Sequence, residues 1–73
     1  MDEKHFKSRA YGLKELAMLY FPNIAPQSAS NQLRRWMRRQ PLMGQLAAAG
    51  YRKGQKILTP KQVALIADHV GDP

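Results

Sequence analysis

The stretch that decides the fold is residues 25–39, with the sequence APQSASNQLRRWMRR. At 100° per residue, one side of a helix over this stretch is apolar and carries Ala29, Leu33, Trp36 and Met37. The opposite side is polar and basic, and it carries Gln27, Ser28, Asn31, Arg34, Arg35, Arg38 and Arg39. Pro26 suits the first helical position, where no backbone donor is needed. We predict a helix over 26–39 with one buried face and one arginine-rich face.

The exposed face has the chemistry of a helix that enters the major groove of DNA. Arginine binds phosphates and guanine edges, whereas Asn and Gln suit adenine. On the early part of the helix, Gln27, Asn31 and Arg34 are expected to reach base edges, with Ser28 beside them. Later positions favour phosphates, and these are Arg35, Arg38 and Arg39. The alternative is a solvated arginine-rich surface without a ligand.

Size and charge agree with a small nucleic-acid-binding protein. The chain has 73 residues, and twelve Lys and Arg oppose five Asp and Glu, which gives a formal net charge of +7. A field of this sign attracts polyanions, nucleic acid before an anionic membrane. There is no cysteine, no long apolar run and no apolar segment near the start. These features predict a cytoplasmic protein without disulfides, thiolate zinc sites, membrane spans or a signal peptide.

A first helix is predicted over residues 13–21 from apolar residues at helical spacing. Gly12 is an acceptable N-cap, and Glu15 lies in the first turn, where the helix dipole favours it. Pro22 ends the helix, and a short turn between prolines leads to the arginine helix. Ile24, in this turn, is expected to fill the core. Two helices joined in this way make a helix-turn-helix candidate.

The second half of the chain predicts two more helices around a basic hairpin. A short helix is expected over 41–49, with Gly50 at its C-terminal end. Residues 51–58 are interpreted as a β-hairpin around Gly54, a candidate wing with basic side chains at Arg52, Lys53 and Lys56. Thr59, Pro60 and Gln62 form a strong helix start, a capping box followed by a buried stripe of Val63, Ile66, Ala67 and Val70.

The expected architecture is mainly α: a small helical bundle with a helix-turn-helix and a short β-hairpin as a wing. Residues 1–9, with Lys4, Lys7 and Arg9, are interpreted as a mobile basic arm, and residues 10–73 as a single domain. A domain of this size buries only about 60% of its unfolded surface, so its stability is modest.

Two resemblances follow from these motifs. The segment Leu13-Lys14-Glu15-Leu16-Ala17, together with Arg34-Arg35-Trp36, resembles the opening of excisionase and MerR-type winged helices. The match departs at 41–49, where an extra short helix separates the recognition helix from the wing.

Over nearly the whole chain, the sequence resembles small Bacteroides-type proteins of domain of unknown function 4248. Residues that carry this resemblance include Leu19-Tyr20-Phe21-Pro22, Gly50-Tyr51, Leu58-Thr59-Pro60 and Gly71-Asp72-Pro73. It implies a small helical domain resembling a helix-turn-helix and supplies no activity or catalytic residue.

Catalysis is not expected from this sequence. The carboxylates form no pair at a spacing suited to acid–base work, and the glycines form no phosphate loop. Two distant histidines, His5 and His69, do not make a metal site without further ligands. Neither a cofactor nor a small-molecule substrate is expected, and the expected ligand is double-stranded DNA.

The second class of function is a protein-interaction module without direct DNA contact. The same helices suit an acidic partner or a second copy of the chain. Met18 and Leu65 point away from the apolar stripes of their helices, and if they cluster they form an apolar patch for dimerisation. A monomer at every concentration would exclude the dimer form of this class.

Overall fold

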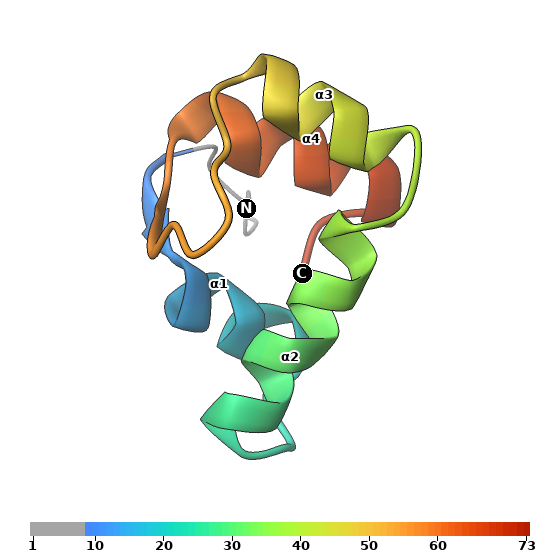
Figure 1. Ribbon diagram of the computed structural model, residues 1–73. Coiled ribbons are helices and arrows are strands. Elements are labelled where there is room, and N and C mark those ends of the chain that lie inside the picture. Colours follow the sequence, from blue (N-terminus) through green and yellow to red (C-terminus); the bar gives the residue numbers. More distant parts are fainter. Residues whose placement is uncertain (1–8) are drawn as a thin grey trace, which may run out of the picture.

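The computed structural model describes residues 9–73, and this part of the chain folds into four helices and two short strands. The elements are β1 (Tyr11–Gly12), α1 (Leu13–Tyr20), α2 (Pro26–Met37), α3 (Leu42–Ala48), β2 (Ile57–Leu58) and α4 (Pro60–Val70). In Figure 1, α3 and α4 lie side by side across one end of the molecule, and α1 packs against α2 at the other. The predicted mainly α class, a small helical bundle, is confirmed.

Local capping sets the helix starts as predicted. The backbone N–H of Gly12, the N-cap of α1, donates to Oε1 of Glu15 at 3.2 Å. At the start of α4, the N–H of Gln62 donates to Oγ1 of Thr59 at 3.2 Å, and the N–H of Thr59 donates to Oε1 of Gln62 at 3.0 Å. This reciprocal pair is the predicted capping box. The predicted helices over 13–21 and 26–39 end slightly earlier, at Tyr20 and Met37.

One apolar core joins all four helices with the two strands. Its largest side chains without solvent exposure come from α1, α2, α3, β2 and α4, namely Leu16, Leu33, Leu46, Leu58, Ile66 and Val63. The positions on α2 agree with the predicted apolar face, since Ala29, Leu33 and Met37 are buried. Burial of such a face, more than helix propensity, holds a short helix in place.

An aromatic cluster closes the core between α1 and α2. The ring of Trp36 lies edge-on to Tyr20, with centroids 5.4 Å apart, and tilted against Phe21 at 4.7 Å. Such pairs add stabilisation beyond their buried area. Trp36 therefore packs on the core, as expected. The prediction that Ile24 fills the core is wrong: its side chain is 41% exposed, because the whole turn over residues 22–25 runs along the surface.

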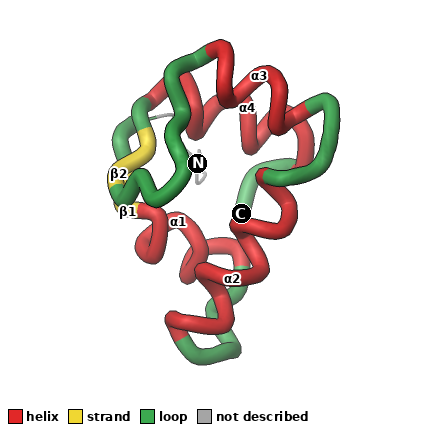
Figure 2. Tube along the Cα trace, viewed as in Figure 1, coloured by secondary structure: helices red, strands yellow, loops and turns green. Residues whose placement is uncertain are grey.

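The predicted hairpin over 51–58 is corrected by the strand pairing. Only Ile57–Leu58 is a strand, and its antiparallel partner is Tyr11–Gly12, far away in the sequence (Figure 2). The backbone N–H of Leu13 extends this pairing with a 2.7 Å hydrogen bond to the carbonyl of Lys56. The physical reason is that Gly54 closes a tight turn over 52–55, in which the N–H of Arg52 bonds to the side chain of Gln55 instead of to a cross-strand backbone partner.

Three further apolar positions differ from expectation. Val70 was predicted in the buried stripe of α4 but is exposed, because the helix extends beyond the core at its last turn. Met18 and Leu65, which would form a surface patch if they clustered, are half-buried and pack against the core. The most exposed large apolar side chain among residues 9–73 is instead Ile57, at 61%.

Candidate nucleic-acid interface

The outward face of α2 carries the residues that the sequence assigned to DNA. Gln27, Ser28, Asn31, Arg35 and Arg38 are exposed, as is Arg39 just beyond the helix, and Arg34 is half-buried. The face is divided along its length. Polar side chains occupy its first half, where Nε2 of Gln27 donates to Oδ1 of Asn31 at 3.4 Å. The arginines occupy its second half, next to the start of α3.

The end of α3 places a tyrosine beside the arginines. The N–H of Gly50 donates to the carbonyl of Ala47 at 3.0 Å, and the N–H of Tyr51 donates to that of Leu46 at 2.9 Å. With Gly50 at φ 89°, this pair of bonds is a Schellman motif. The chain therefore reverses direction at Gly50. Tyr51, the next residue, is half-buried and packs against the core.

A tight turn follows and presents a lysine at its tip. The N–H of Gln55 donates to the carbonyl of Arg52 at 3.0 Å, so Lys53 and Gly54 are the two central residues. Gly54 has φ 84°, the conformation that the third position of a type II turn requires. The turn therefore requires a glycine at position 54, although the flanking residues do not form the predicted hairpin.

Two glutamine side chains hold this turn against α4. Nε2 of Gln55 lies 2.6 Å from the carbonyl of Ile57 and 2.7 Å from Oε1 of Gln62, while Oε1 of Gln55 accepts from the N–H of Arg52. Gln62 is 1% exposed and donates from Nε2 to the carbonyl of Ala49 at 3.1 Å. The buried amide of Gln62 and the half-buried amide of Gln55 together fix the backbone on both sides of Lys53.

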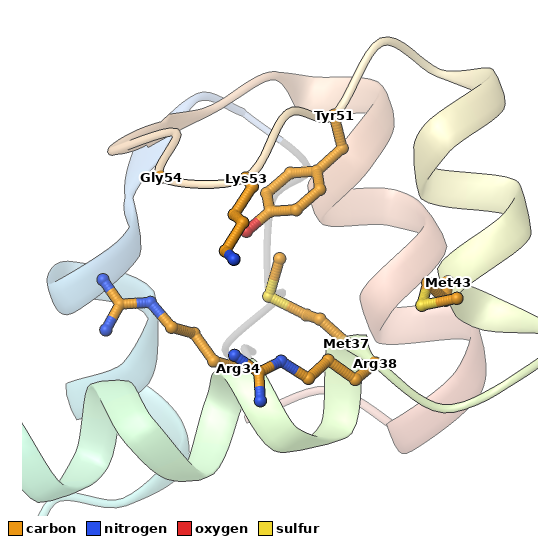
Figure 3. Close-up of a pocket in the computed structure, with 7 residues that line it drawn as sticks. All are labelled: Arg34, Met37, Arg38, Met43, Tyr51, Lys53 and Gly54. Carbon is orange, nitrogen blue, oxygen red and sulfur yellow. The ribbon is translucent and has the colours of Figure 1, made fainter.

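The turn and α2 enclose a groove of about 690 Å³. Its lining consists of Arg34, Met37, Arg38, Met43, Tyr51, Lys53 and Gly54. In Figure 3, the Tyr51 ring and the Lys53 side chain point from the turn toward α2, and Met37 points from α2 toward the ring. Arg34 and Arg38 extend from α2 along the opening. The structure thus brings Arg34, Arg38 and Lys53 to one place, from two elements.

These cations have no acidic partner within residues 9–73. The ion pair in this part of the chain joins Arg9 and Glu15 at 3.0 Å, with the Arg9 guanidinium also 3.8 Å from the ring centroid of Tyr11. Hydrogen bonding to Arg9, followed by the Gly12 N–H, lowers the pKa of Glu15. Glu15 is therefore paired with Arg9 and leaves the charge of the groove cations uncompensated.

Other predicted contacts lie apart from the groove. Arg35 and Arg39 are exposed but do not line it, and Gln27 and Ser28 lie at the opposite end of α2. Lys56 is exposed beside the start of α1, where its carbonyl accepts from Leu13.

Of the predicted arm over residues 1–9, the structure describes Arg9 alone. Lys4 and Lys7 fall outside the residues that the structure describes. Arg9 is exposed and tied to Glu15.

Four groove residues were not among the sequence candidates for the site, namely Met37, Met43, Tyr51 and Gly54. Tyr51 was assigned to a hairpin, and Met43 received no role in DNA binding. Gly50 could have indicated the position of Tyr51, because a glycine that ends a helix in a Schellman motif also fixes the direction of the next residue. Met43 had no such signal, because its place in the groove depends on how α3 packs beside α2.

Fold and groove define a small, mainly helical protein with a cationic surface groove. The chain belongs to the family described as Domain of unknown function (DUF4248), which matches residues 7–73. No curated protein and no solved structure matches it. In the part of the chain from residue 9 onward, no helix has the length and apolar character to cross a membrane, and no three potential metal ligands cluster.

Proposed function

We propose that this protein binds double-stranded DNA, with α2 in the major groove and the turn at 52–55 against the backbone. The observation that carries the proposal is the convergence of Arg34, Arg38 and Lys53 from two elements, with no acidic partner among residues 9–73. Uncompensated cations on a fixed surface favour a polyanion, since each phosphate contact releases a counterion.

The arrangement of α1 and α2 supports this orientation. The two helices pack against each other and are joined by residues 21–25, as in a helix-turn-helix. In that motif the second helix lies in the major groove and the first crosses the backbone. Here the second helix is α2, whose apolar side is buried against α1 and whose basic side faces solvent.

The roles of individual residues follow from their positions. Gln27, Asn31 and Arg34 read base edges, with Ser28 beside them on the early part of α2. Phosphate contacts come from the later arginines and from the turn, namely Arg35, Arg38, Arg39, Arg52, Lys53 and Lys56. A single module of this kind covers about 600–1,000 Å² of DNA, so tight specific binding requires a dimer, a tandem site or a partner protein.

A protein-interaction module is the second candidate, and one observation favours it. Met43, at the side of the cationic groove, is 45% exposed, and exposed apolar side chains ringed by cations suit an acidic partner with an apolar residue. Partner capture without DNA binding would select this function. The cytoplasmic location stays a prediction.

Fluorescence anisotropy with a labelled random-sequence duplex at low salt tests the proposal. We expect the double variant Arg34→Ala/Arg38→Ala to bind at least tenfold more weakly than the wild type. Lys14→Ala/Lys61→Ala removes the same charge from exposed positions of α1 and α4 and is expected to bind like the wild type. Equal weakening by both pairs would mean that binding depends on net charge alone and not on the groove. If Arg34→Ala/Arg38→Ala does not weaken binding, α2 is not the DNA-binding helix. Circular dichroism confirms that each variant is folded.

A further inference from the structure

The groove between α2, the start of α3 and the turn at 52–55 has a lining that DNA phosphates alone do not explain. Arg34, Arg38 and Lys53 lie around its opening, whereas Met37 and Met43 provide apolar surface. The ring of Tyr51 points into the same space (Figure 3). A phosphate group is polar on every side and gains nothing from thioether and aromatic surface.

From this pairing we infer that the groove binds a small amphiphilic anion: an aryl or short alkyl group that carries a carboxylate or a phosphate. The apolar part packs on Met43 and the face of Tyr51, and the anionic part reaches the cations at the opening. Arg34 and Arg38 are one helical turn apart on α2, so both guanidinium groups can approach one anion. Lys53 approaches it from the other side.

Size and composition agree with such a ligand. Binding sites for small molecules measure about 300–1,000 Å³ and combine apolar walls with a few charged groups, and this groove holds about 690 Å³. Methionine side chains adjust their shape to different apolar groups and make favourable contacts with aromatic rings. Guanidinium groups bind carboxylate and phosphate in a planar, bidentate manner.

The groove is also built in advance of binding. The Schellman motif at Gly50 fixes the direction of Tyr51, and the hydrogen bonds of Gln55 hold the turn that carries Lys53. Arg34 and Arg38 stand on a regular helix. A ligand therefore orders side chains rather than backbone, which reduces the entropy lost on binding.

This site does not depend on DNA binding, because its chemistry is complete without DNA. If DNA also binds as proposed, the two ligands share Arg34, Arg38 and Lys53 and exclude each other. The anion is bound and not converted, so no small-molecule substrate is implied.

Methyl NMR of the full chain, without DNA, tests the inference. The protein is labelled with ¹³C-methyl methionine and titrated with phenyl phosphate up to about 10 mM. We expect saturable shifts at Met37 and Met43 and none at Met18, which lies on α1 outside the groove lining. Inorganic phosphate and phenol, each one half of the probe, should bind at least tenfold more weakly. Absence of saturable shifts, or shifts of equal size at Met18, would overturn the inference. Equal affinity for either half alone would also overturn it.

Exposed positions provide variants with little risk to folding. Arg38→Ala/Lys53→Ala should weaken phenyl phosphate at least tenfold, while the charge-matched control Lys14→Ala/Lys61→Ala should not. Met43→Ala should weaken phenyl phosphate and leave inorganic phosphate unchanged. Should Met43→Ala weaken both equally, the apolar wall would have no part in binding. Because DNA is absent, these outcomes are independent of whether the protein binds DNA.

Discussion

The side-chain amides of Gln55 and Gln62 are joined by a 2.7 Å hydrogen bond from Nε2 of the first to Oε1 of the second. Gln62 stands in the first turn of α4 and is buried, and Gln55 belongs to the turn that presents Lys53. The same two amides bind the backbone of Ala49, Ile57 and Thr59. The segment between α3 and α4 is thus fixed to α4 by side chains rather than by a local strand pair.

Replacement of the buried amide should destabilise the whole protein. Gln62→Leu removes hydrogen bonds to Ala49, Gln55 and Thr59 and leaves partly buried polar groups without these partners, which costs about 1–3 kcal/mol. Urea unfolding measures this loss in the free energy of unfolding. Lys61→Ala, at the exposed neighbouring position, should stay within about 0.5 kcal/mol of the wild type. A Gln62→Leu protein as stable as the wild type would contradict the role given to this network.

The N-cap of α4 should contribute less to the free energy of unfolding than the Gln62 amide does. The loss should depend on which residue replaces Thr59. Thr59→Ala leaves the N–H of Gln62 without its acceptor, a loss of about 1 kcal/mol. For a domain of this size the melting temperature then falls by about 4–8 °C. Thr59→Ser keeps the hydroxyl and should melt within a degree or two of the wild type, by about the margin that separates Ser and Thr as caps. If Ser and Ala lower the melting temperature equally, the hydroxyl is not the cap.

Alkaline pH should weaken the fold through Tyr20. Partial burial, with the charge of Asp72 as a smaller cause, raises the pKa of Tyr20 from 10.0 to about 12, and its hydroxyl donates to the carbonyl of Gly71 at 2.7 Å. A raised pKa means that the folded state favours the neutral phenol. Its contribution is therefore complete below the unfolded pKa of 10.0 and is lost as the pH rises toward about 12.

The matching measurement compares the wild type with Tyr20→Phe. Urea unfolding of both proteins at about pH 9 and about pH 11.5 isolates the Tyr20 phenol, because the two proteins share every other ionisable group. The wild type should be the more stable protein at the lower pH, by about 1 kcal/mol for the lost hydrogen bond, and the difference should shrink at the higher pH. A difference that grows with pH would contradict the assigned direction.

Competition between the two proposed ligands is a separate prediction. Phenyl phosphate at saturating concentration should displace a bound duplex, because both need Arg34, Arg38 and Lys53. Equilibrium linkage requires the reverse as well, so DNA should weaken phenyl phosphate by the same factor. Anisotropy follows the first effect and methyl NMR the second. Phenol, which lacks the anion, should displace nothing. Simultaneous binding of both ligands would place DNA on another face.

Local signals in the sequence were sufficient for the helices. Thr59, Pro60 and Gln62 marked the start of α4 with a capping box whose chemistry needs no partner elsewhere in the chain. Gly12 likewise marked the start of α1. Periodic apolar residues gave the buried side of α2, and therefore also the exposed side with its arginines. Each of these features depends on residues within one or two turns.

Contacts between distant residues could not be predicted in this way. Leu58 pairs with Tyr11, and no local property of residues 51–58 specifies a partner so far away in the chain. The groove likewise depends on contacts between distant residues. Met43 reaches the arginines of α2 through the packing of α3, and Lys53 reaches them through the hydrogen bonds of Gln55. Ile24 was misplaced because the whole turn over residues 22–25 lies on the surface, and apolar character alone does not show this. The sequence supplied the charged residues of the candidate site but not their arrangement.

The salt dependence of DNA binding tests the central claim most directly. For wild-type protein and a random duplex, the logarithm of the binding constant should fall with the logarithm of salt concentration with a slope of about −3 to −6. Arg38→Ala/Lys53→Ala should reduce the magnitude of the slope by about two, one phosphate for each side chain, and Lys14→Ala/Lys61→Ala should leave it unchanged. An unchanged slope in the first variant, or no binding by the wild type even at low salt, would contradict a DNA interface built from α2 and the turn at 52–55.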